Sequence, residues 1–549
     1  MESGASLDKE GNLKVGSALE MASMHYQQVA SRLQEWKRII ESNPGKFGEL
    51  EHAIHEEYRK GADMVLAAYL VMVHAVASFD AAAESTRKQY AIPLTRGRVR
   101  QIQLRLLGGL VIWIKSLYCE PSRRWFRENN PEKVPGIYVG LAQCGITSGI
   151  SPALESLIVR QVAGTHSFEF AVDELQRQGI SMSYKAIRRV AYECGDGLLT
   201  LRKRELERLR AGTLISSGEL AGCRVVVQSD GGRMKFRYEK TARAGSEFQV
   251  RETARESESD ADTEHNAMLP EDGGRAKAKK RGRKTYRTEW REPKLVTIYI
   301  IDRNGKQVKN SRSWIDGTLQ GPDTLAEIIA MHLFRLGAGQ AESITFASDG
   351  APWIWDRIDG ILAMAQIPSS VKIHKVLDCC HAIGQMQAAL KQFGLSETMF
   401  KGLGRLHRKQ IRNGEWELVV RSLEKRLSRN GSLSASAQQL INRSINYLRH
   451  HGSARRMDYP KFSLMGIPLG SGAIESGIRR VINMRLKSNG MFWLAEHAES
   501  ILQLRCHYIS KRLDERLVEK RVELSRNGKL DWQLPPRHNS PDHPLNSSA

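Results

Sequence analysis

The chain has 549 residues, of which 41% are hydrophobic, so it is long enough for two to four domains with real cores. Its 83 lysines and arginines exceed its 61 aspartates and glutamates, and the net charge of +22 favours a polyanionic partner such as nucleic acid. A membrane is excluded as a partner because the most apolar stretch, residues 64–77, is shorter than the roughly 20 apolar residues that span a bilayer. We expect a buried helix there.

The N-terminus lacks a basic segment followed by an apolar one, so the sequence predicts no secretory signal and a cytoplasmic, nucleoid-associated protein. The seven cysteines form no CxxC pair and are odd in number, which indicates reduced thiols and disfavours a zinc site.

Residues 1–95 are predicted as a helical region, with two or three helices and a break at Asn43-Pro44-Gly45. Residues 96–150 are predicted as a β-ribbon. In particular, apolar and basic residues alternate over about 95–120 and break at Gly108-Gly109, which indicates a hairpin with one cationic face. That face either contacts DNA or is solvated.

Residues 151–215 are predicted as a helix-turn-helix region. One helix covers 168–177, a turn follows, and Ser183 is a plausible N-cap for the second helix. We expect three cations of the second helix to contact DNA; the alternative is an ordinary helical hairpin that packs. They are Lys185, Arg188 and Arg189.

Residues 216–389 change to strand patterns, interrupted at 251–287 by a segment that is acidic and then basic and that predicts a mobile loop. Strands are expected near 225–228, 295–301, 311–318, 344–347 and 371–377, with helices from Asp356, His381 and Gly472. The fold class is therefore α/β. Residues 390–465 read as a basic helical insertion, residues 466–520 return to the core, and residues 521–549 are predicted as a disordered tail.

Three carboxylates stand out by their position in these elements. Asp230 and Asp349 each follow a β-branched run and precede glycine, and Glu475 lies at the start of a basic helix. Strand ends hold such side chains rigidly, and the glycines would allow a phosphate backbone to approach. Two-metal phosphoryl chemistry needs several converging carboxylates, so the three predict a divalent-metal nuclease centre.

Asp378 ends another strand and has His381 three residues later, so the two could share one face of a helical turn. They either support the metal site or form a structural hydrogen bond. Trp353 and Trp355 lie beside Asp349 and either stack on a displaced base or fill the core.

The residues after Glu475 predict one amphipathic helix with a basic outer face. Its apolar members would face the sheet, and its cations would hold DNA against the metal site or form a solvated face. These cations are Arg479, Arg480, Arg485 and Lys487.

Taken together, Asp230-Gly, Asp349-Gly-Ala-Pro-Trp, Asp378-x-x-His381 and Gly-Ser-Gly-Ala-Ile-Glu475-Ser resemble the DDE transposases of bacterial insertion sequences. The likeness is nearest to the Kra-type group and, more distantly, to Mutator-like enzymes with the acid-x-x-His element. It covers about residues 220–510. One departure is Cys119, which lacks the cysteine partner often found in the N-terminal part of such proteins.

The resemblance implies an RNase H-like catalytic domain with a large helical insertion, preceded by a mostly helical DNA-binding region. In it Asp230, Asp349 and Glu475 would hold two Mg²⁺ ions, with Mn²⁺ as a substitute. The expected partners are double-stranded DNA of the element's terminal inverted repeats and of the target, and a homodimer or higher oligomer on DNA. The expected activity is cleavage at the element ends and joining of 3′-OH ends to target DNA. The alternatives are a domesticated DNA-binding relative without catalysis and an RNase H-like structure-specific nuclease.

Overall fold

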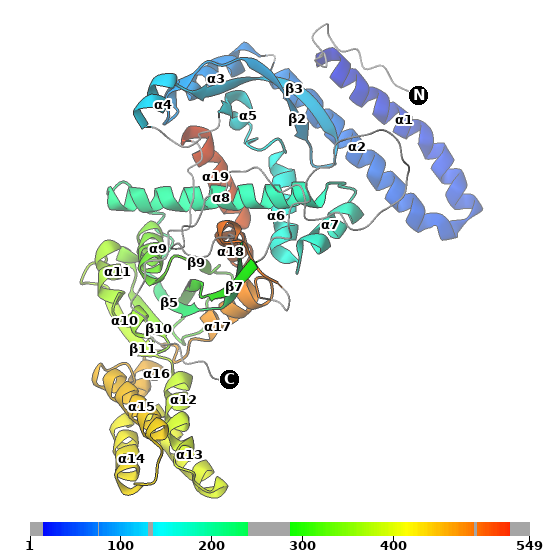
Figure 1. Cartoon of the computed structure of the whole chain (residues 1–549). Helices are drawn as coiled ribbons and strands as arrows, with labels where there is room; N and C mark the ends of the chain where they lie inside the picture. Colours follow the sequence, from blue (N-terminus) through cyan, green and yellow to red (C-terminus); the bar gives the residue numbers. More distant parts are fainter. Residues whose placement is uncertain (1–14, 75, 130–135, 240–285, 488–490, 528–549) are drawn as a thin grey trace, which may run out of the picture.

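The computed structural model describes residues 15–74, 76–129, 136–239, 286–487 and 491–527 (Figure 1). The interval 251–285 of the predicted loop and residues 528–549 of the predicted tail lie outside this part. The described chain combines helices with three sheets, so the α/β class is confirmed.

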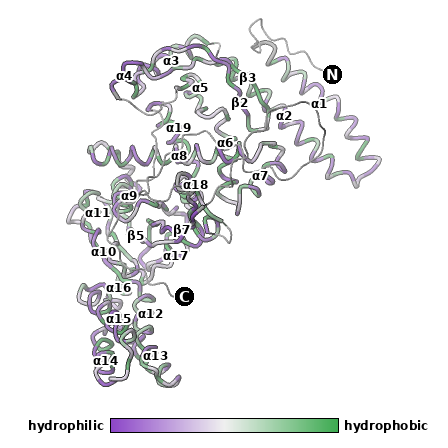
Figure 2. The backbone as a smooth tube through the Cα atoms, viewed as in Figure 1, coloured by the Kyte–Doolittle hydropathy of each residue, from purple (hydrophilic) through white to green (hydrophobic). Residues whose placement is uncertain are grey.

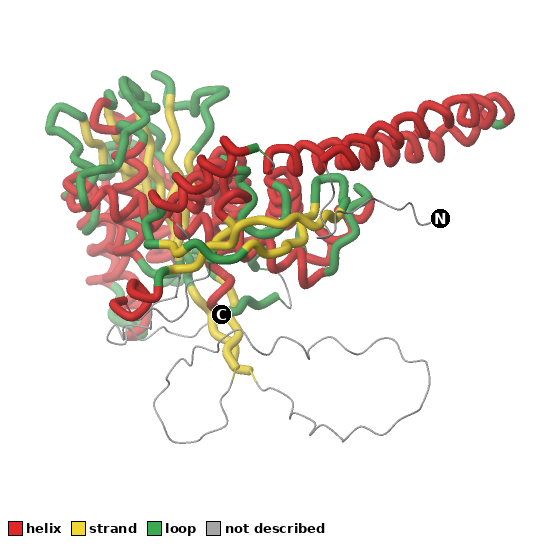
Figure 3. The backbone as a smooth tube through the Cα atoms, turned by 90° about the horizontal axis from the view of Figure 1, so that it is seen from above, coloured by secondary structure: helices red, strands yellow, loops and turns green. Residues whose placement is uncertain are grey.

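The N-terminal region is a helical hairpin followed by a third helix, as predicted. Its elements are α1 (Val15–Ser42), the short η1 (Pro44–Lys46), α2 (Phe47–His74) and α3 (Ala77–Gln89). The break follows from Asn43, whose side chain accepts a hydrogen bond from Gly45 N at 3.0 Å. Hydrophilic and hydrophobic stretches alternate along α1 and α2 (Figure 2), and the pair extends away from the rest of the molecule (Figure 3).

The expectation of a buried helix at 64–77 is wrong in part. Ala67 and Ala68 are buried, but Leu66, Tyr69 and Val73 are 50%, 57% and 39% exposed because only one face of α2 packs against α1. Among the described helices, none taken singly has the length and apolar character to cross a membrane; one pair bent by 73°, Pro44–His74 with Ala77–Gln89, passes that test jointly.

The predicted hairpin is present. Strand β2 (Val99–Arg105) pairs antiparallel with β3 (Val111–Pro121), and β1 (Leu94–Thr95) and β4 (Ile137–Tyr138) add to β3. Its turn is fixed from outside, since buried Asp63 of α2 accepts hydrogen bonds from Gly108 N and Leu110 N, both at 2.8 Å. Two short helices, α4 (Arg123–Asn129) and α5 (Val139–Gln143), complete this part.

Three helices then lead to the central sheet: α6 (Pro152–Gly164), α7 (Phe168–Arg177) and α8 (Tyr184–Arg210). Ser183 caps α8 as predicted, accepting from Ala186 N at 3.3 Å. Helix α8 continues far beyond the turn, and most of its length is buried in the core.

The central sheet has five strands in the order β11-β10-β5-β8-β9. Strands β5, β10 and β11 are parallel, whereas β8 and β9 run antiparallel to their neighbours. The bounds are β5 (Arg224–Gly231), β8 (Lys294–Ile301), β9 (Trp314–Thr318), β10 (Ser343–Ser348) and β11 (Lys372–Leu377), close to those expected. A separate pair that the sequence analysis missed, β6 (Met234–Glu239) with β7 (Tyr286–Arg291), flanks the interval 240–285.

Helices cover both faces of this sheet because its strands are apolar on both sides. Val225 and Val227 belong to a core with α9, whereas Leu295 and Ile315 belong to a second core with α8 and α18. The helices of these layers are α9 (Pro322–Arg335), η2 (Ala338–Gln340), α10 (Pro352–Trp355), α11 (Ile358–Met364), α17 (Gly472–Ile478) and α18 (Ala495–Ile509).

Between β11 and α17 the described chain is helical, as predicted for the insertion. The helices extend beyond β10 and β11 (Figure 1) and are α12 (Cys379–Lys391), α13 (Glu397–Arg412), α14 (Trp416–Arg429), α15 (Ala435–Ser453) and α16 (Tyr459–Leu464).

Two expectations about the C-terminal part need correction. Residues 521–527 are not a disordered tail but the end of α19 (Leu513–Asn527), where Arg521 donates to Glu155 and Leu524 is buried. The segment after Glu475 is not one α-helix either, since α17 ends at Ile478 and a π-helical turn, η3, covers Arg479–Asn483.

Candidate metal centre

Strand register brings three aspartates to one edge of the sheet. Phe346 of β10 pairs with Val227 of β5, so three residues further along Asp349 comes level with Asp230. On the other side Ser348 pairs with Leu377 of β11, so Asp349 and Asp378 leave neighbouring strands together. The three carboxylates therefore start from adjacent parallel strands at the same edge.

Glu475 is brought to this edge by two hydrogen-bonded attachments of α17. The first is Gln228 of β5, which is 1% exposed; its Oε1 accepts from Ile474 N at 3.1 Å and its Nε2 donates to Gly470 O at 2.9 Å. The second is Asp378, whose Oδ2 accepts from Ser471 N at 2.5 Å and from Ser471 Oγ at 2.6 Å. The helix start is thus fixed to two strands that carry site aspartates.

Asp378 uses both of its oxygens inside the protein. Its Oδ1 accepts from Cys380 N at 2.6 Å and His381 N at 3.0 Å, which caps α12. Burial would raise the pKa of Asp378, but the hydrogen bonds from His381 and Ser471 outweigh it and hold that pKa well below its usual range. Asp378 is therefore ionised and acts as the link between α12 and α17.

His381 completes a small cluster with this link. One ligand atom each of Asp378, His381 and Glu475 lies within 4.8 Å of the others, and His381 Nδ1 is 3.5 Å from Asp378 Oδ1. The hydrogen bond with Asp378 raises the pKa of His381 despite partial burial, and the charges of Asp349 and Glu475 raise it further. The His381 side chain is 46% exposed, so it can reach a bound ligand.

Asp230 and Asp349 stand close enough to affect one another electrostatically. Burial raises the pKa of Asp230, the hydrogen bond from Gly231 N partly offsets this, and the charge of Asp349 raises it again. Within the described residues, no lysine or arginine forms an ion pair with Asp230, Asp349 or Glu475. The edge therefore has an excess of negative charge that a cation would neutralise.

Two glycines after the aspartates allow close packing of side chains from other elements. A Cβ at Gly350 would lie 2.0 Å from the ring of Tyr447, and one at Gly232 would lie 2.3 Å from Ile482. Protein side chains fill this space, so close packing already accounts for the lack of a side chain at Gly232 and Gly350. Gly350 instead lets α15 of the insertion contact the end of β10.

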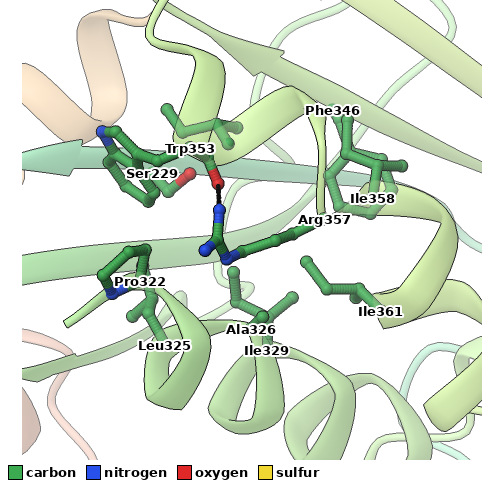
Figure 4. Close-up of a pocket in the computed structure, with 11 residues that line it drawn as sticks. Ser229, Pro322, Leu325, Ala326, Ile329, Phe346, Trp353, Arg357, Ile358 and Ile361 are labelled. Carbon is green, nitrogen blue, oxygen red and sulfur yellow. Dashed lines mark hydrogen bonds between the residues drawn. The ribbon is translucent and has the colours of Figure 1, made fainter. Parts of the chain in front are cut away.

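The two tryptophans after Asp349 have different surroundings. Trp355 is 4% exposed, donates from Nε1 to Asp349 O at 2.8 Å and packs under Arg456, so it belongs to the core. Trp353 lines an apolar pocket between α9 and α11, where its carbonyl accepts from Arg357 Nη1 at 2.9 Å (Figure 4). No carboxylate lines that pocket, although Ser229, the residue before Asp230, forms part of its wall.

The predicted basic face is only partly present. Arg479, Arg480 and Lys487 are exposed, but Arg485 is 1% exposed, with its guanidinium 5.2 Å from the Phe168 ring centroid. Burial lowers the pKa of Arg485 to about 10. Its predicted contact with DNA is therefore wrong, because the π-helical turn rotates it into the core.

The three cations predicted on the helix-turn-helix keep access to solvent. Lys185 and Arg189 are exposed on the first turns of α8, and the Arg188 guanidinium lies 5.6 Å from the Tyr184 ring centroid. They lie on a separate element from the carboxylates.

Sequence reasoning did not single out Gln228, Ser471, Tyr447 or Glu292. Gln228 had a signal, since it precedes Asp230 by two residues and strand alternation puts both on one face. Glu292 contacts Gly231 and is paired with Lys294 at 2.6 Å, a placement that depends on the unpredicted β6–β7 pair. Comparisons of the chain with known protein families, curated proteins and solved structures find no match.

Proposed function

We propose that the protein is a DDE transposase that cuts DNA at the ends of its element and joins the 3′-OH ends to target DNA. The observation that carries this proposal is that strand register places Asp230 and Asp349 at one edge of the sheet, near the cluster of Glu475, Asp378 and His381. The five residues come from four segments that lie far apart in the sequence, so the fold brings them together. An incidental cluster of surface residues would not need such an arrangement.

The topology supports the finer fold assignment that we propose, an RNase H-like catalytic domain. Numbered within the sheet, the order β11-β10-β5-β8-β9 reads 5-4-1-2-3, with the second strand antiparallel to the first and the last two parallel to it. The helical insertion falls between the fifth strand and the helix of Glu475, where the resemblance to such transposases expects it.

The donor set fits Mg²⁺ or Mn²⁺. Carboxylate oxygens are the hard ligands that these ions prefer, and the edge has no arginine or lysine pairing with the three acids within the described chain. Asp230, Asp349 and Glu475 would hold two ions. When bound, such ions stabilise the charge that develops on phosphorus and activate an oxygen nucleophile.

The chain's own residues position this chemistry. Asp378 and Gln228 hold α17 so that Glu475 faces the strand ends. His381, whose raised pKa favours the protonated ring, can donate a hydrogen bond to a phosphate oxygen of the cut strand. The net charge of +22 and the exposed cations of α8 supply attraction for double-stranded DNA.

A plasmid-nicking assay tests the proposal directly. The full chain with Mg²⁺ or Mn²⁺ should nick supercoiled DNA, and Asp349→Asn should reduce the rate at least about a hundredfold. Asp356→Asn is the matched control, since Asp356 is an exposed aspartate seven positions away. Unchanged nicking in Asp349→Asn would remove the carboxylates from the reaction.

Strand transfer separates the transposase from a nuclease. Duplexes carrying the sequences that flank the gene should be joined to a target plasmid through their 3′-OH ends. Cleavage of branched DNA without joining would instead favour the structure-specific nuclease, and binding without either would favour the non-catalytic relative.

A further inference from the structure

Helix α13 of the insertion carries a row of exposed cations, which we call the α13 stripe. One narrow sector of the helix holds four of these cations, Lys401, Arg405, Arg408 and Arg412, because they are spaced by four, three and four residues. The fifth, Lys409, is adjacent to this sector. The opposite side contains buried His407 and Ile411. The stripe consists of Lys401, Arg405, Arg408, Lys409 and Arg412.

The stripe's charge is nearly uncompensated. The only acid on α13 is Glu397, which pairs with Lys401 at 2.5 Å in its first two turns. Across the described residues, no carboxylate forms an ion pair with Arg405, Arg408 or Lys409. Helix α12, against which α13 packs, contains no acidic residue at all. Protein partners within the chain therefore do not explain why the row is basic.

The stripe leads to the start of α12, the helix that follows Asp378. Helices α12 and α13 are joined by the short segment 392–396, so α13 returns along α12 toward the sheet. At its end the Arg412 guanidinium lies near the Cys379 thiol, the residue that follows Asp378. His381 is exposed on the same first turn of α12. One end of the row thus lies at the start of α12, the helix that carries His381, and the other points away from it.

We propose that the α13 stripe binds the phosphate backbone of the duplex whose strand is cut at the carboxylates. This rests on the proposed function and adds the path of the DNA to it. From Lys401 to Arg412 the helix rises about 16 Å, which matches about five base pairs at 3.4 Å each. The contact is to phosphates and is independent of sequence, because guanidinium and ammonium groups on one row meet the backbone and not the base edges.

Salt dependence of binding tests the stripe without any cleavage. The variant Arg405→Gln with Arg408→Gln keeps helix-forming side chains and loses two charges. The measurement uses the full chain, a fluorescent random-sequence duplex and no divalent metal. The negative slope of log affinity against log salt should become shallower by about 2, near one unit for each lost phosphate contact.

The neighbouring helix offers a matched control. Lys425→Gln with Arg429→Gln removes the same charge from exposed positions of α14, where four cations are accompanied by Glu417 and Glu424. We expect this pair to leave the slope within experimental error of wild type. Equal losses from both pairs, or an unchanged slope in the α13 pair with an unchanged melting temperature, would overturn the proposal.

A crosslinking measurement keeps the test independent of the chemistry. A photoreactive residue in place of Lys409, which is exposed at the edge of the stripe, should crosslink to the duplex. If wild-type protein never nicks DNA but the slope and crosslink respond as stated, the proposed catalysis fails while the DNA surface stands. If nicking depends on Asp349 but neither measurement responds, the stripe is wrong and the catalysis stands.

Discussion

At the scale of single residues, the carboxylates differ in how many hydrogen bonds they accept: one each for Asp230, Asp349 and Glu475, and four for Asp378. Two of the four donors to Asp378 belong to Ser471; burial would raise the pKa of Asp378, but the His381 side chain and then the Ser471 donors outweigh it and lower that pKa. Asp230 has a raised pKa, which follows first from burial and is increased by the neighbouring charge of Asp349. In the proposed function, Asp378 therefore positions the site, whereas Asp230, Asp349 and Glu475 would hold the metal ions.

Asp378→Asn tests this division. An amide nitrogen in place of Oδ2 would oppose the Ser471 N–H, so α17 should loosen and Glu475 should lose its orientation. We expect Mn²⁺ affinity, measured by calorimetry, to fall about 10- to 100-fold, as for other residues that orient metal ligands. Ser471→Ala, which keeps the backbone donor, should cost less.

The control for fold is Asp359→Asn, an exposed aspartate paired only with Lys375 on the surface. It should bind Mn²⁺ like wild type. An Asp378→Asn protein that melts normally and binds Mn²⁺ with unchanged affinity would show that the link to Ser471 has no role in holding the site.

At the scale of elements, local sequence patterns predicted the structure correctly where one residue type determines it. The β-branched runs before Asp230 and Asp349 form strands, and Ser183 caps its helix. The β6–β7 pair was missed because its strands are joined across the interval 240–285, and pairing at that separation leaves no local signal.

The burial of Arg485 was missed for a different reason. Periodicity was extended from Glu475 as one α-helix, but η3 is π-helical and inserts one extra residue, which rotates later positions by about 100°. Arg485 then meets Phe168 and Trp493 instead of solvent. Such turns depend on tertiary packing, here of Val481 and Ile482 in the core, and not on the sequence of the turn itself.

The start of α8 supplies a prediction about DNA at this scale. Lys185 and Arg189 are one turn apart and exposed, whereas the later turns are buried in the core. Lys185→Ala with Arg189→Ala should weaken binding to element-end DNA by about 10-fold or more, and should weaken binding to random DNA less, as measured by fluorescence anisotropy.

Lys203→Ala is the control on the same helix, because Lys203 is exposed at its opposite end. It should leave both affinities nearly unchanged. Equal losses on the two DNAs in the double variant would limit Lys185 and Arg189 to phosphate contacts, and no loss would favour the reading of α7 and α8 as a packing hairpin.

At the scale of the whole molecule, ion pairs join α19 to the helices before the central sheet and to a helix that packs on this sheet. Lys520 of α19 pairs with Glu155 of α6 at 2.5 Å, and Arg516 pairs with Glu205 of α8 at 2.7 Å. A further pair, Arg335 of α9 with Glu519, reaches the sheet layer at 2.6 Å. The helical region before the sheet and the sheet itself are thus held by one C-terminal helix.

The carboxylate of Glu205 makes the stability of the contact between α8 and α19 depend on pH. Burial alone would raise its pKa, but Arg516 and then Arg335 outweigh that effect and lower it to about 2. Because the folded-state pKa lies below the unfolded one, the stabilisation is complete above the ordinary glutamate range near 4.5 and is lost as pH falls toward 2.

Removing one partner of a buried pair typically costs about 3–5 kcal/mol. Glu205→Gln should therefore lower the melting temperature strongly near neutral pH, and its deficit relative to wild type should shrink as pH falls through that window. Glu207→Gln, exposed on the same helix, should melt like wild type throughout. A deficit for Glu205→Gln that stays constant over the acid range would mean that the carboxylate charge does not hold α8 to α19.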